Sequence, residues 1–365
     1  MFVENIDTIS LNEFISLKYK DTIQSNGSKI LSYTGTNDEY NYLRYGVGIH
    51  LNNCSLIIEL LGNDVIDFLH RVSTNSINDV KPFYKRNTLF LNEKGRFIDR
   101  AIYINFGDSH FLVGHTDADN RLLNWVNRYI ISEDIKTKDI SGNYLLLDFI
   151  GPQAESFLTL IVGDELKSLN GENIIKCIVD GFEFFVFSQH EPFGNKYYKV
   201  LISSTFSAKF LAYLEDNRSV FDFGLVGEKA FKKFRIESGM PVFPNEINDN
   251  YNPHDTNLLS EVNFKKGCYI GQEVIARLDT YDKVQNKMVK VEINSTEEII
   301  EPLVITNDAK EEIGEITSIY KCDAGDKYIG LAVIKKKFLI NDFKLFVETN
   351  AVRIPISYQD IQNFK

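Results

Sequence analysis

One stretch of the sequence places a thiol beside basic side chains and ahead of a potential helix. Cys268 follows Lys265, Lys266 and Gly267, and the residues after Gly271 can begin a helix. A thiol reacts as its thiolate, which nearby lysines and a helix N-terminus stabilise. Cys268 is therefore a candidate reactive group. The alternative is that it packs as a small apolar side chain, as isolated cysteines commonly do.

The cysteines form no metal-binding pattern. No Cys-x-x-Cys pair occurs, and no His-x-x-x-His pair lies near any of the four, which are Cys54, Cys177, Cys268 and Cys322. Their spacing therefore supports no zinc or iron-sulfur site. So few thiols in so long a chain are typical of a reducing compartment rather than of a secreted, disulfide-stabilised protein.

The composition is that of a folded globular protein. The 365 residues are 44% hydrophobic and 25% charged, and this length predicts two or three domains. The net charge of -11 argues against duplex nucleic acid or anionic lipid as the main ligand. The first residues lack the basic start and apolar stretch of a signal peptide, and no apolar run could span a bilayer. We therefore expect a cytoplasmic location without membrane association.

A pattern of strand, glycine turn and helix occurs twice. Residues 55–60 and 144–149 have the character of strands, and a helical pattern follows each. Three residue types recur after 89 residues, in the pairs Gly62 and Gly151, Phe68 and Phe157, and Leu69 and Leu158. This repeat predicts two α+β units of similar build.

The remaining patterns complete the predicted elements. Residues 88–114 predict an antiparallel meander, and residues 117–131, 205–214 and 227–238 predict helices. Residues 10–52 predict irregular structure with a strand or two, and residues 240–257 a functional loop. Short alternating strands after residue 285 predict a β-barrel. We expect domains at 1–140, 141–284 and 285–365, with the first two able to interleave.

Residues 266–273, Lys-Gly-Cys-Tyr-Ile-Gly-Gln-Glu, resemble the signature of the YgfZ-like folate-binding proteins. These are relatives of the glycine-cleavage T-protein, an aminomethyltransferase. Residues 235–241 are similar to the Arg-x-Glu-x-Gly-x-Pro helix end of that family, and residues 60–64, 73–75 and 92–96 also match it. T-proteins have a Phe-Ile-Gly-Lys-Glu type of sequence where this chain has Cys268 to Glu273, so the resemblance favours the YgfZ-like branch.

The resemblance implies a fold and a cofactor. The fold would be α+β, with two ferredoxin-like or T-protein-type domains and a β-barrel around a central channel. The channel would hold tetrahydrofolate or a one-carbon derivative. The aminopyrimidine of folate suits a carboxylate, its benzoyl ring an apolar or aromatic wall, and its glutamate tail a cation.

Positions in the family motifs give the expected cofactor-binding residues. Arg235 is the first choice for a folate contact, although an arginine at a helix C-terminus also offsets the helix dipole. The other candidates are Glu237, Lys266, Tyr269, Gln272, Asp255 and Glu191. Asp255 stands at the position of the glutamate in a Pro-x-Glu of the family. Glu191 is the nearest substitute for the family glutamate that binds the pterin, and it could equally be an exposed loop acid.

Two hypotheses of function follow, with Cys268 and Asp99 as candidate catalytic residues. T-proteins carry an Asp-Asp pair where this chain has Asp99-Arg100, so one carboxylate has become a cation. The first hypothesis is a folate-dependent accessory factor for iron-sulfur clusters, including those of tRNA methylthiotransferases. Cys268 is then its working thiol, and iron-sulfur client or assembly proteins are its partners. The alternative is a tetrahydrofolate-dependent aminomethyltransferase or methyltransferase that uses Asp99. A folate-binding scaffold without chemistry is the third reading.

Overall fold

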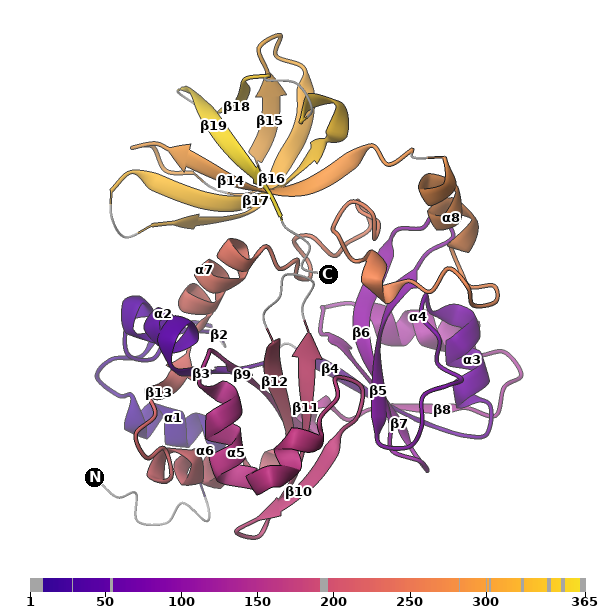
Figure 1. Ribbon diagram of the computed structural model, residues 1–365, viewed down its shortest axis with the longest axis vertical. Coiled ribbons are helices and arrows are strands. Elements are labelled where there is room, and N and C mark those ends of the chain that lie inside the picture. The colour runs from indigo at the N-terminus through magenta and orange to yellow at the C-terminus, as the bar shows by residue number, and fades with distance from the viewer. Residues whose placement is uncertain are drawn as a thin grey trace.

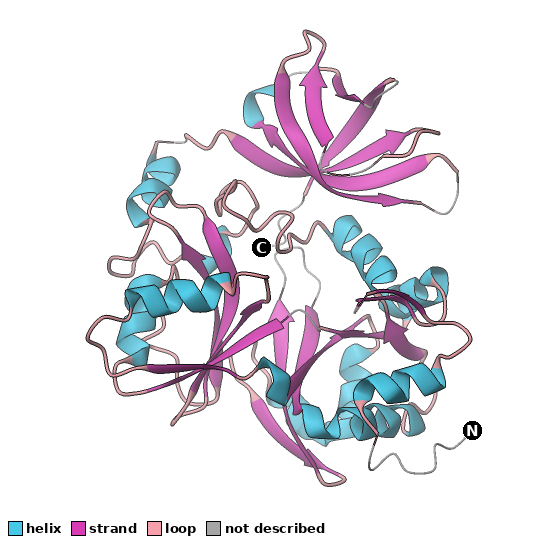
Figure 2. Cartoon of the chain, turned by 180° about the vertical axis from the view of Figure 1, so that it is seen from behind, coloured by secondary structure: helices cyan, strands magenta, loops and turns pink. Residues whose placement is uncertain are grey.

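The computed structural model describes residues 9–27, 29–52, 55–190, 196–281, 283–299, 301, 303–322, 325–339, 343–348 and 352–361. Two α+β units lie beside each other, and a β-barrel lies across them (Figure 1). Seen from behind, the two units contain both helices and strands, and the barrel consists almost entirely of strands (Figure 2). The predicted α+β class with a C-terminal barrel is confirmed.

The first unit is a five-stranded antiparallel sheet with the strand order β5-β6-β7-β4-β8. Its elements are β4 (Ser55–Leu61), α3 (Val65–Val72), β5 (Tyr84–Leu91), β6 (Phe97–Asn105), β7 (His110–His115), α4 (Arg121–Tyr129) and β8 (Lys136–Asp139). The apolar faces of α3 and α4 pack on the sheet, and Trp125 of α4 meets Phe90 edge-on with ring centroids 5.4 Å apart.

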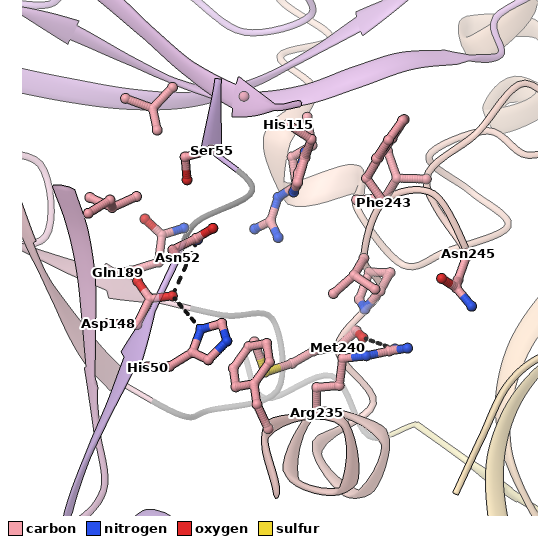
Figure 3. Close-up of a pocket in the computed structure, with 18 of the residues that line it drawn as sticks. His50, Asn52, Ser55, His115, Asp148, Gln189, Arg235, Met240, Phe243 and Asn245 are labelled. Carbon is pink, nitrogen blue, oxygen red and sulfur yellow. Dashed lines mark hydrogen bonds and ion pairs between the residues drawn. The ribbon is translucent and has the colours of Figure 1, made fainter. Parts of the chain in front are cut away.

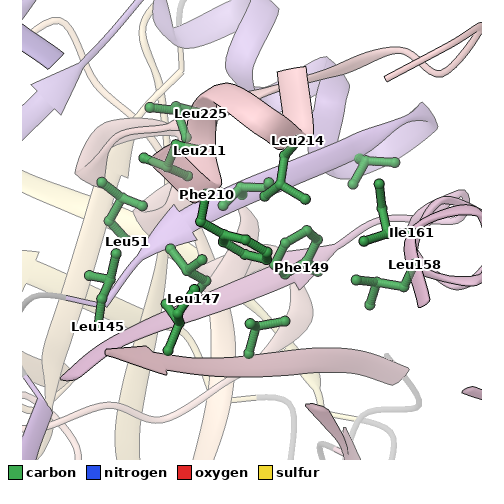
Figure 4. Packing of buried hydrophobic residues seen from close by; sticks show 14 of the residues in the cluster. Leu51, Leu145, Leu147, Phe149, Leu158, Ile161, Phe210, Leu211, Leu214 and Leu225 are labelled. Atoms are coloured by element: carbon green, nitrogen blue, oxygen red, sulfur yellow. The ribbon is translucent and has the colours of Figure 1, made fainter. Parts of the chain in front are cut away.

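The second unit has the strand order β10-β11-β12-β9-β3-β13, in which only β3 and β13 run parallel. Its strands are β3 (Val47–Leu51), β9 (Tyr144–Ile150), β10 (Ile175–Val179), β11 (Phe182–His190), β12 (Lys196–Ser203) and β13 (Phe223–Val226). Its helices are α1 (Leu11–Lys18), α2 (Thr36–Tyr45), α5 (Ala154–Val162), α6 (Ser207–Asp216) and α7 (Glu228–Ser238). Leucine, isoleucine and phenylalanine side chains of the strands and of α5 and α6 interlock in its core (Figure 4).

The expectation of irregular structure before residue 52 was wrong. This segment forms α1, α2 and β3, together with the hairpin of β1 (Gln24–Asn26) and β2 (Lys29–Ser32). Only Glu39 and Leu43 of α2 are fully buried, so its sequence shows little apolar periodicity. The Glu39 carboxylate instead accepts backbone N–H groups from Tyr33 and from Gly227. Such a tertiary contact leaves no local pattern in the sequence.

The two sheets show the predicted repeat. The order β5-β6-β7-β4 recurs as β10-β11-β12-β9, and a helix follows the last-named strand in both units. Gly62 and Gly151 both have positive φ, +135° and +124°. A Cβ on Gly62 would lie 1.8 Å from the Asp134 carbonyl oxygen, and one on Gly151 2.4 Å from that of Gly46. The turn therefore requires glycine in both units. The chain enters the second sheet at β3 before it builds the first, and the domain boundaries at 140 and 284 stay a prediction.

The C-terminal unit is a closed barrel with the strand order β14-β17-β16-β15-β18-β19. Its strands are β14 (Asn286–Asn294), β15 (Leu303–Asn307), β16 (Glu312–Lys321), β17 (Lys327–Lys335), β18 (Leu345–Glu348) and β19 (Arg353–Asp360). Helix α8 (Gln272–Thr280) precedes the barrel. In the described ranges no helix combines the length and apolarity needed to cross a membrane.

Candidate functional site

A cavity of about 380 Å³ lies between the two sheets and α7 (Figure 3). Apolar side chains of both sheets pack together at this junction. Polar groups enter the cavity from β3, β9, β12 and α7, and residues 240–247 close another side. The apolar and aromatic part of its wall comprises Ala101, Ile102, Val113, Leu146, Tyr197, Phe231, Met240, Pro241, Val242, Phe243, Pro244 and Ile247. The predicted functional loop thus reaches the cavity between the two sheets.

Arg235 positions this loop as well as lining the cavity. Gly239 adopts φ +72° and ends α7, so the chain turns and the Met240 N–H returns to the Arg235 carbonyl oxygen at 2.8 Å. The Arg235 guanidinium forms a buried ion pair with Glu246 at 3.3 Å and donates to Ser318 Oγ of the barrel at 2.6 Å. This arginine therefore ties α7, the loop and the barrel together at the cavity wall.

A buried ionic cluster crosses three neighbouring strands on the other side of the cavity. His50 of β3, Asp148 of β9 and Lys199 of β12 lie opposite one another in register. Lys199 Nζ forms an ion pair with Asp148, and His50 Nε2 lies 3.2 Å from Glu228 Oε1 of α7. The His50 ring stacks on Phe231 at 4.0 Å. Figure 3 shows Asp148 between His50 and Asn52.

Electrostatics keep this cluster charged. Burial lowers the pKa of His50, but Asp148 and Glu228 outweigh it and raise that pKa to about 9. Burial likewise opposes ionisation of Asp148, and Lys199 and His50 outweigh it and hold the Asp148 pKa below its ordinary value. The cavity wall therefore carries compensated charges rather than isolated ones.

Asp99 lies beneath the cavity wall rather than in it. It is 2% exposed, and its oxygens accept the Arg100 N–H, the His115 N–H and the His115 ring at Nδ1. Its neighbour Arg100 lines the cavity and forms a two-oxygen ion pair with the buried Glu261, with Nη2 2.6 Å from Oε1. Successive residues of a strand face opposite sides, so the cation of the Asp99-Arg100 pair faces the cavity.

The signature segment lies outside the lining of this cavity. Lys266 Nζ binds the carbonyl oxygens of His70, Ser73 and Asn75 at the end of α3, and burial lowers its pKa to about 8. Tyr269 is buried beneath that ammonium group, 5.3 Å from ring centroid to Nζ. The ammonium group thus has a structural role.

Cys268 is exposed and precedes the N-cap of α8, Gly271. Gln272, the first residue of that helix, approaches the Gly267 carbonyl oxygen at 3.5 Å. The thiol is therefore accessible from solvent, and the structure does not bring it together with the lining of the cavity between the two sheets.

The remaining candidates are dispersed. Asp255 is buried at a second cavity, of about 400 Å³, between α8 and the start of the barrel; there it pairs with Arg96 at 3.2 Å. Burial raises the pKa of Asp255 to about 6. Glu237 accepts a hydrogen bond from Tyr40 on the far side of α7 from Arg235. Glu191 and Cys54 lie outside the described residues.

Sequence reasoning missed the ionic cluster and His115. Asp148 is the single charged residue of β9, whose sequence is Tyr-Leu-Leu-Leu-Asp-Phe-Ile. A charge inside an apolar strand needs a partner, and this signal could have identified Asp148. Within the described part of the chain, no group of three or more His, Cys, Asp or Glu side chains could hold a metal ion.

Comparisons with known proteins place this architecture in a family. Residues 18–266 match the GCVT N-terminal domain. The aminomethyltransferase of Leptospira biflexa is 24% identical over 339 residues, which cover 87% of this chain and 86% of that protein. The aminomethyltransferase of Thermotoga maritima is 26% identical over 318 residues, which cover 86% and 85%.

Two further proteins are similar to the chain. The protein named "Putative transferase At1g60990, chloroplastic" of Arabidopsis thaliana is 25% identical over 291 residues, or 77% of this chain, and the chain spans 63% of its length. The crystal structure of glycine cleavage system aminomethyltransferase T from Bartonella henselae has the same fold, with a TM-score of 0.79, 17% identity, and coverage of 96% of this chain and 98% of that one. Because the family match covers most of its length, the chain belongs to the GCVT N-terminal domain family, within the superfamily of the aminomethyltransferase T-proteins.

Proposed function

We propose that the chain binds tetrahydrofolate, or a one-carbon derivative of it, in the cavity between the two sheets. One observation carries this proposal: the cavity combines a long apolar and aromatic wall with a buried carboxylate and with cations. Its volume of about 380 Å³ lies in the range of small-molecule sites.

The residues present fit the chemistry of a folate. Asp148 is a buried carboxylate of the kind that an aminopyrimidine edge requires, and it keeps a lone pair beyond those directed at Lys199, Asn52 and His50. Lys29 and Lys232 line the same cavity and supply cations of the kind that a glutamate tail requires; Lys232 also pairs with Glu301 at 2.6 Å. A folate would supply the carrier for a one-carbon unit. The protein would hold it and exclude water from it.

A titration calorimetry experiment under anaerobic conditions tests this placement. Val242 lines the cavity, whereas Val220 is 93% exposed and is absent from the lining. Val242→Trp should fill part of the cavity and weaken tetrahydrofolate binding about tenfold or more, while Val220→Trp should bind like the natural chain. Equal affinities of the two variants for tetrahydrofolate would show that the ligand binds outside this cavity.

We further propose that the chain is a YgfZ-like accessory factor in the assembly or repair of iron-sulfur clusters, with Cys268 as its working thiol. The clients would include enzymes such as tRNA methylthiotransferases. Residues 266–273 support this reading, and so does the exposure of the thiol, because a group outside the cavity can meet a partner protein. A cytoplasmic location stays a prediction.

Complementation tests the thiol role. In a strain that lacks the gene, Cys268→Ser should fail to restore the activity of iron-sulfur enzymes. Cys322→Ser is the matched control, because Cys322 is also a cysteine at a partly exposed position. Full restoration by Cys268→Ser would exclude the thiol from the function.

The alternative function is tetrahydrofolate-dependent aminomethyl or methyl transfer. The names of the Leptospira and Thermotoga relatives favour it. Incubation with tetrahydrofolate and an aminomethylated carrier protein should then yield methylenetetrahydrofolate and ammonia. Intact folate binding without this product would favour the accessory role.

A further inference from the structure

His115 and Asp99 form a carboxylate–imidazole pair at the cavity wall. His115 Nδ1 lies 2.7 Å from Asp99 Oδ1, and the backbone N–H of His115 donates to Asp99 Oδ2 at 2.8 Å. The Arg100 N–H donates to Asp99 Oδ1, also at 2.8 Å. The histidine ring lines the cavity and stacks on Phe243, with centroids 5.5 Å apart and planes 19° apart (Figure 3).

These contacts fix which ring nitrogen carries the proton. Both oxygens of Asp99 accept backbone N–H groups, so the carboxylate acts as an acceptor and Nδ1 must be the donor. In the neutral ring this leaves Nε2 with a lone pair. Nε2 has no hydrogen-bond partner in the part of the chain that the structure describes, and the His115 side chain is 31% exposed at the cavity.

Gly114, which precedes His115, leaves room for the Asp99 carboxylate because it has no side chain. A Cβ on Gly114 would lie 2.5 Å from Asp99 Oδ2 and 2.6 Å from Leu122 Cδ2. A side chain there would displace the carboxylate or the helix α4 that covers it. The backbone of β7 is therefore shaped to seat Asp99 directly beneath His115.

We propose that His115 selects among folate forms by accepting a hydrogen bond at Nε2 from an unsubstituted amine N–H of the ligand, and that Asp99 is the positioning residue. This inference rests on the proposed binding of a folate in the cavity. Tetrahydrofolate carries secondary amine N–H groups at N5 and N10; a one-carbon substituent on one nitrogen removes one of them, and a one-carbon unit that bridges both removes both. A site built around an acceptor rejects a ligand that lacks the matching donor, because the acceptor is then left without a partner.

Affinities for three ligands test the selection. Tetrahydrofolate keeps both amine N–H groups, 5-formyltetrahydrofolate lacks that of N5, and 10-formyltetrahydrofolate lacks that of N10. The natural chain should prefer tetrahydrofolate to at least one formyl form by about tenfold. His115→Phe keeps an aromatic ring against Phe243 and removes Nε2, so the preference should disappear. His115→Gln, which restores an acceptor, should recover part of it.

Nitrogen-15 NMR of histidine-labelled protein tests the geometry independently. In its neutral form the His115 ring should show a protonated Nδ1 and an unprotonated Nε2, and tetrahydrofolate should shift the Nε2 resonance. In Asp99→Asn the Nδ1-protonated form should decline, together with the ligand preference.

The outcomes separate this inference from the proposed function. If none of the three ligands binds, both the proposed folate binding and the selection by His115 are wrong. Folate binding with the same preference in the natural chain and in His115→Phe would overturn the inference and leave the proposed function standing. A protonated Nε2 in the natural chain would also overturn the inference.

Discussion

Replacing Lys266 by methionine should destabilise the first α+β unit, because its ammonium group binds three backbone carbonyl oxygens. Lys266 Nζ donates to the carbonyl of His70 in the last turn of α3, and to those of Ser73 and Asn75 at 2.5 and 2.9 Å. Carbonyl groups at a helix end have no partner within the helix. Methionine has a similar length and no donor, so it leaves all three oxygens without this partner.

The magnitude follows from the contacts. A hydrogen bond from a charged donor contributes about 1.5–3 kcal/mol. The loss is smaller than the sum of three such bonds, because one ammonium group makes all three and because water can reach this half-buried site. Loss of the ammonium group above the Tyr269 ring adds about 0.5–1 kcal/mol. We expect a total loss of about 2–4 kcal/mol. Lys265→Met is the matched control, because Lys265 is exposed and its side chain has no hydrogen bond or ion pair among the described residues; its effect should stay within about 0.5 kcal/mol.

Urea unfolding at neutral pH, followed by tryptophan fluorescence, measures this difference. Trp125 is the only tryptophan of the chain and lies in the core that contains the buried face of α3, so its emission reports this unit. The Lys266→Met midpoint should fall clearly below that of Lys265→Met. Coincident unfolding curves would refute the structural role of Lys266. They would favour the earlier expectation that its ammonium group stabilises the Cys268 thiolate.

Three further predictions concern buried polar groups. Burial raises the pKa of Asp255 to about 6 from 3.8, so the folded state tolerates the neutral acid better than the ionised one. The stability of the natural chain relative to Asp255→Asn should therefore fall by about 2 kcal/mol as pH rises from about 4 to 6, and by about 3 kcal/mol in all between about pH 3 and pH 7, as urea unfolding at several pH values would show. Arg235→Met leaves the Glu246 carboxylate buried without its cation and should cost about 3–5 kcal/mol in thermal or urea unfolding. The double variant with Glu246→Gln should recover part of that loss, and no recovery would show that the ion pair is not the cause. Gly114→Ala should disturb Asp99 and cost about 1–3 kcal/mol, and a crystal structure with Asp99 unmoved would contradict this.

Elements with regularly spaced apolar residues could be predicted from the sequence. Leu56, Ile58 and Leu60 alternate in β4, and Phe68 and Leu69 lie on the buried face of α3, so local periodicity was sufficient. Helix α2 could not be found in this way, because its buried contacts centre on the Glu39 carboxylate and on residues distant in sequence.

The candidate site was only partly accessible to such reasoning. Arg235 was predicted from a motif and does line the cavity. The ionic cluster was missed because His50, Asp148 and Lys199 come from strands that become neighbours only in the folded sheet. The side of the sheet that the Asp99 side chain faces could not be predicted either. It depends on how β6 pairs within the sheet and on the absence of a side chain at Gly114, which leaves room for the carboxylate.

A crystal structure of the chain grown with saturating tetrahydrofolate under anaerobic conditions tests the central claim most directly. We predict that the ligand occupies the cavity between the two sheets, with its aminopyrimidine edge against Asp148 and its ring system along the apolar wall that includes Leu146 and Met240. Binding of tetrahydrofolate at any other place, with this cavity filled only by solvent, would contradict the account.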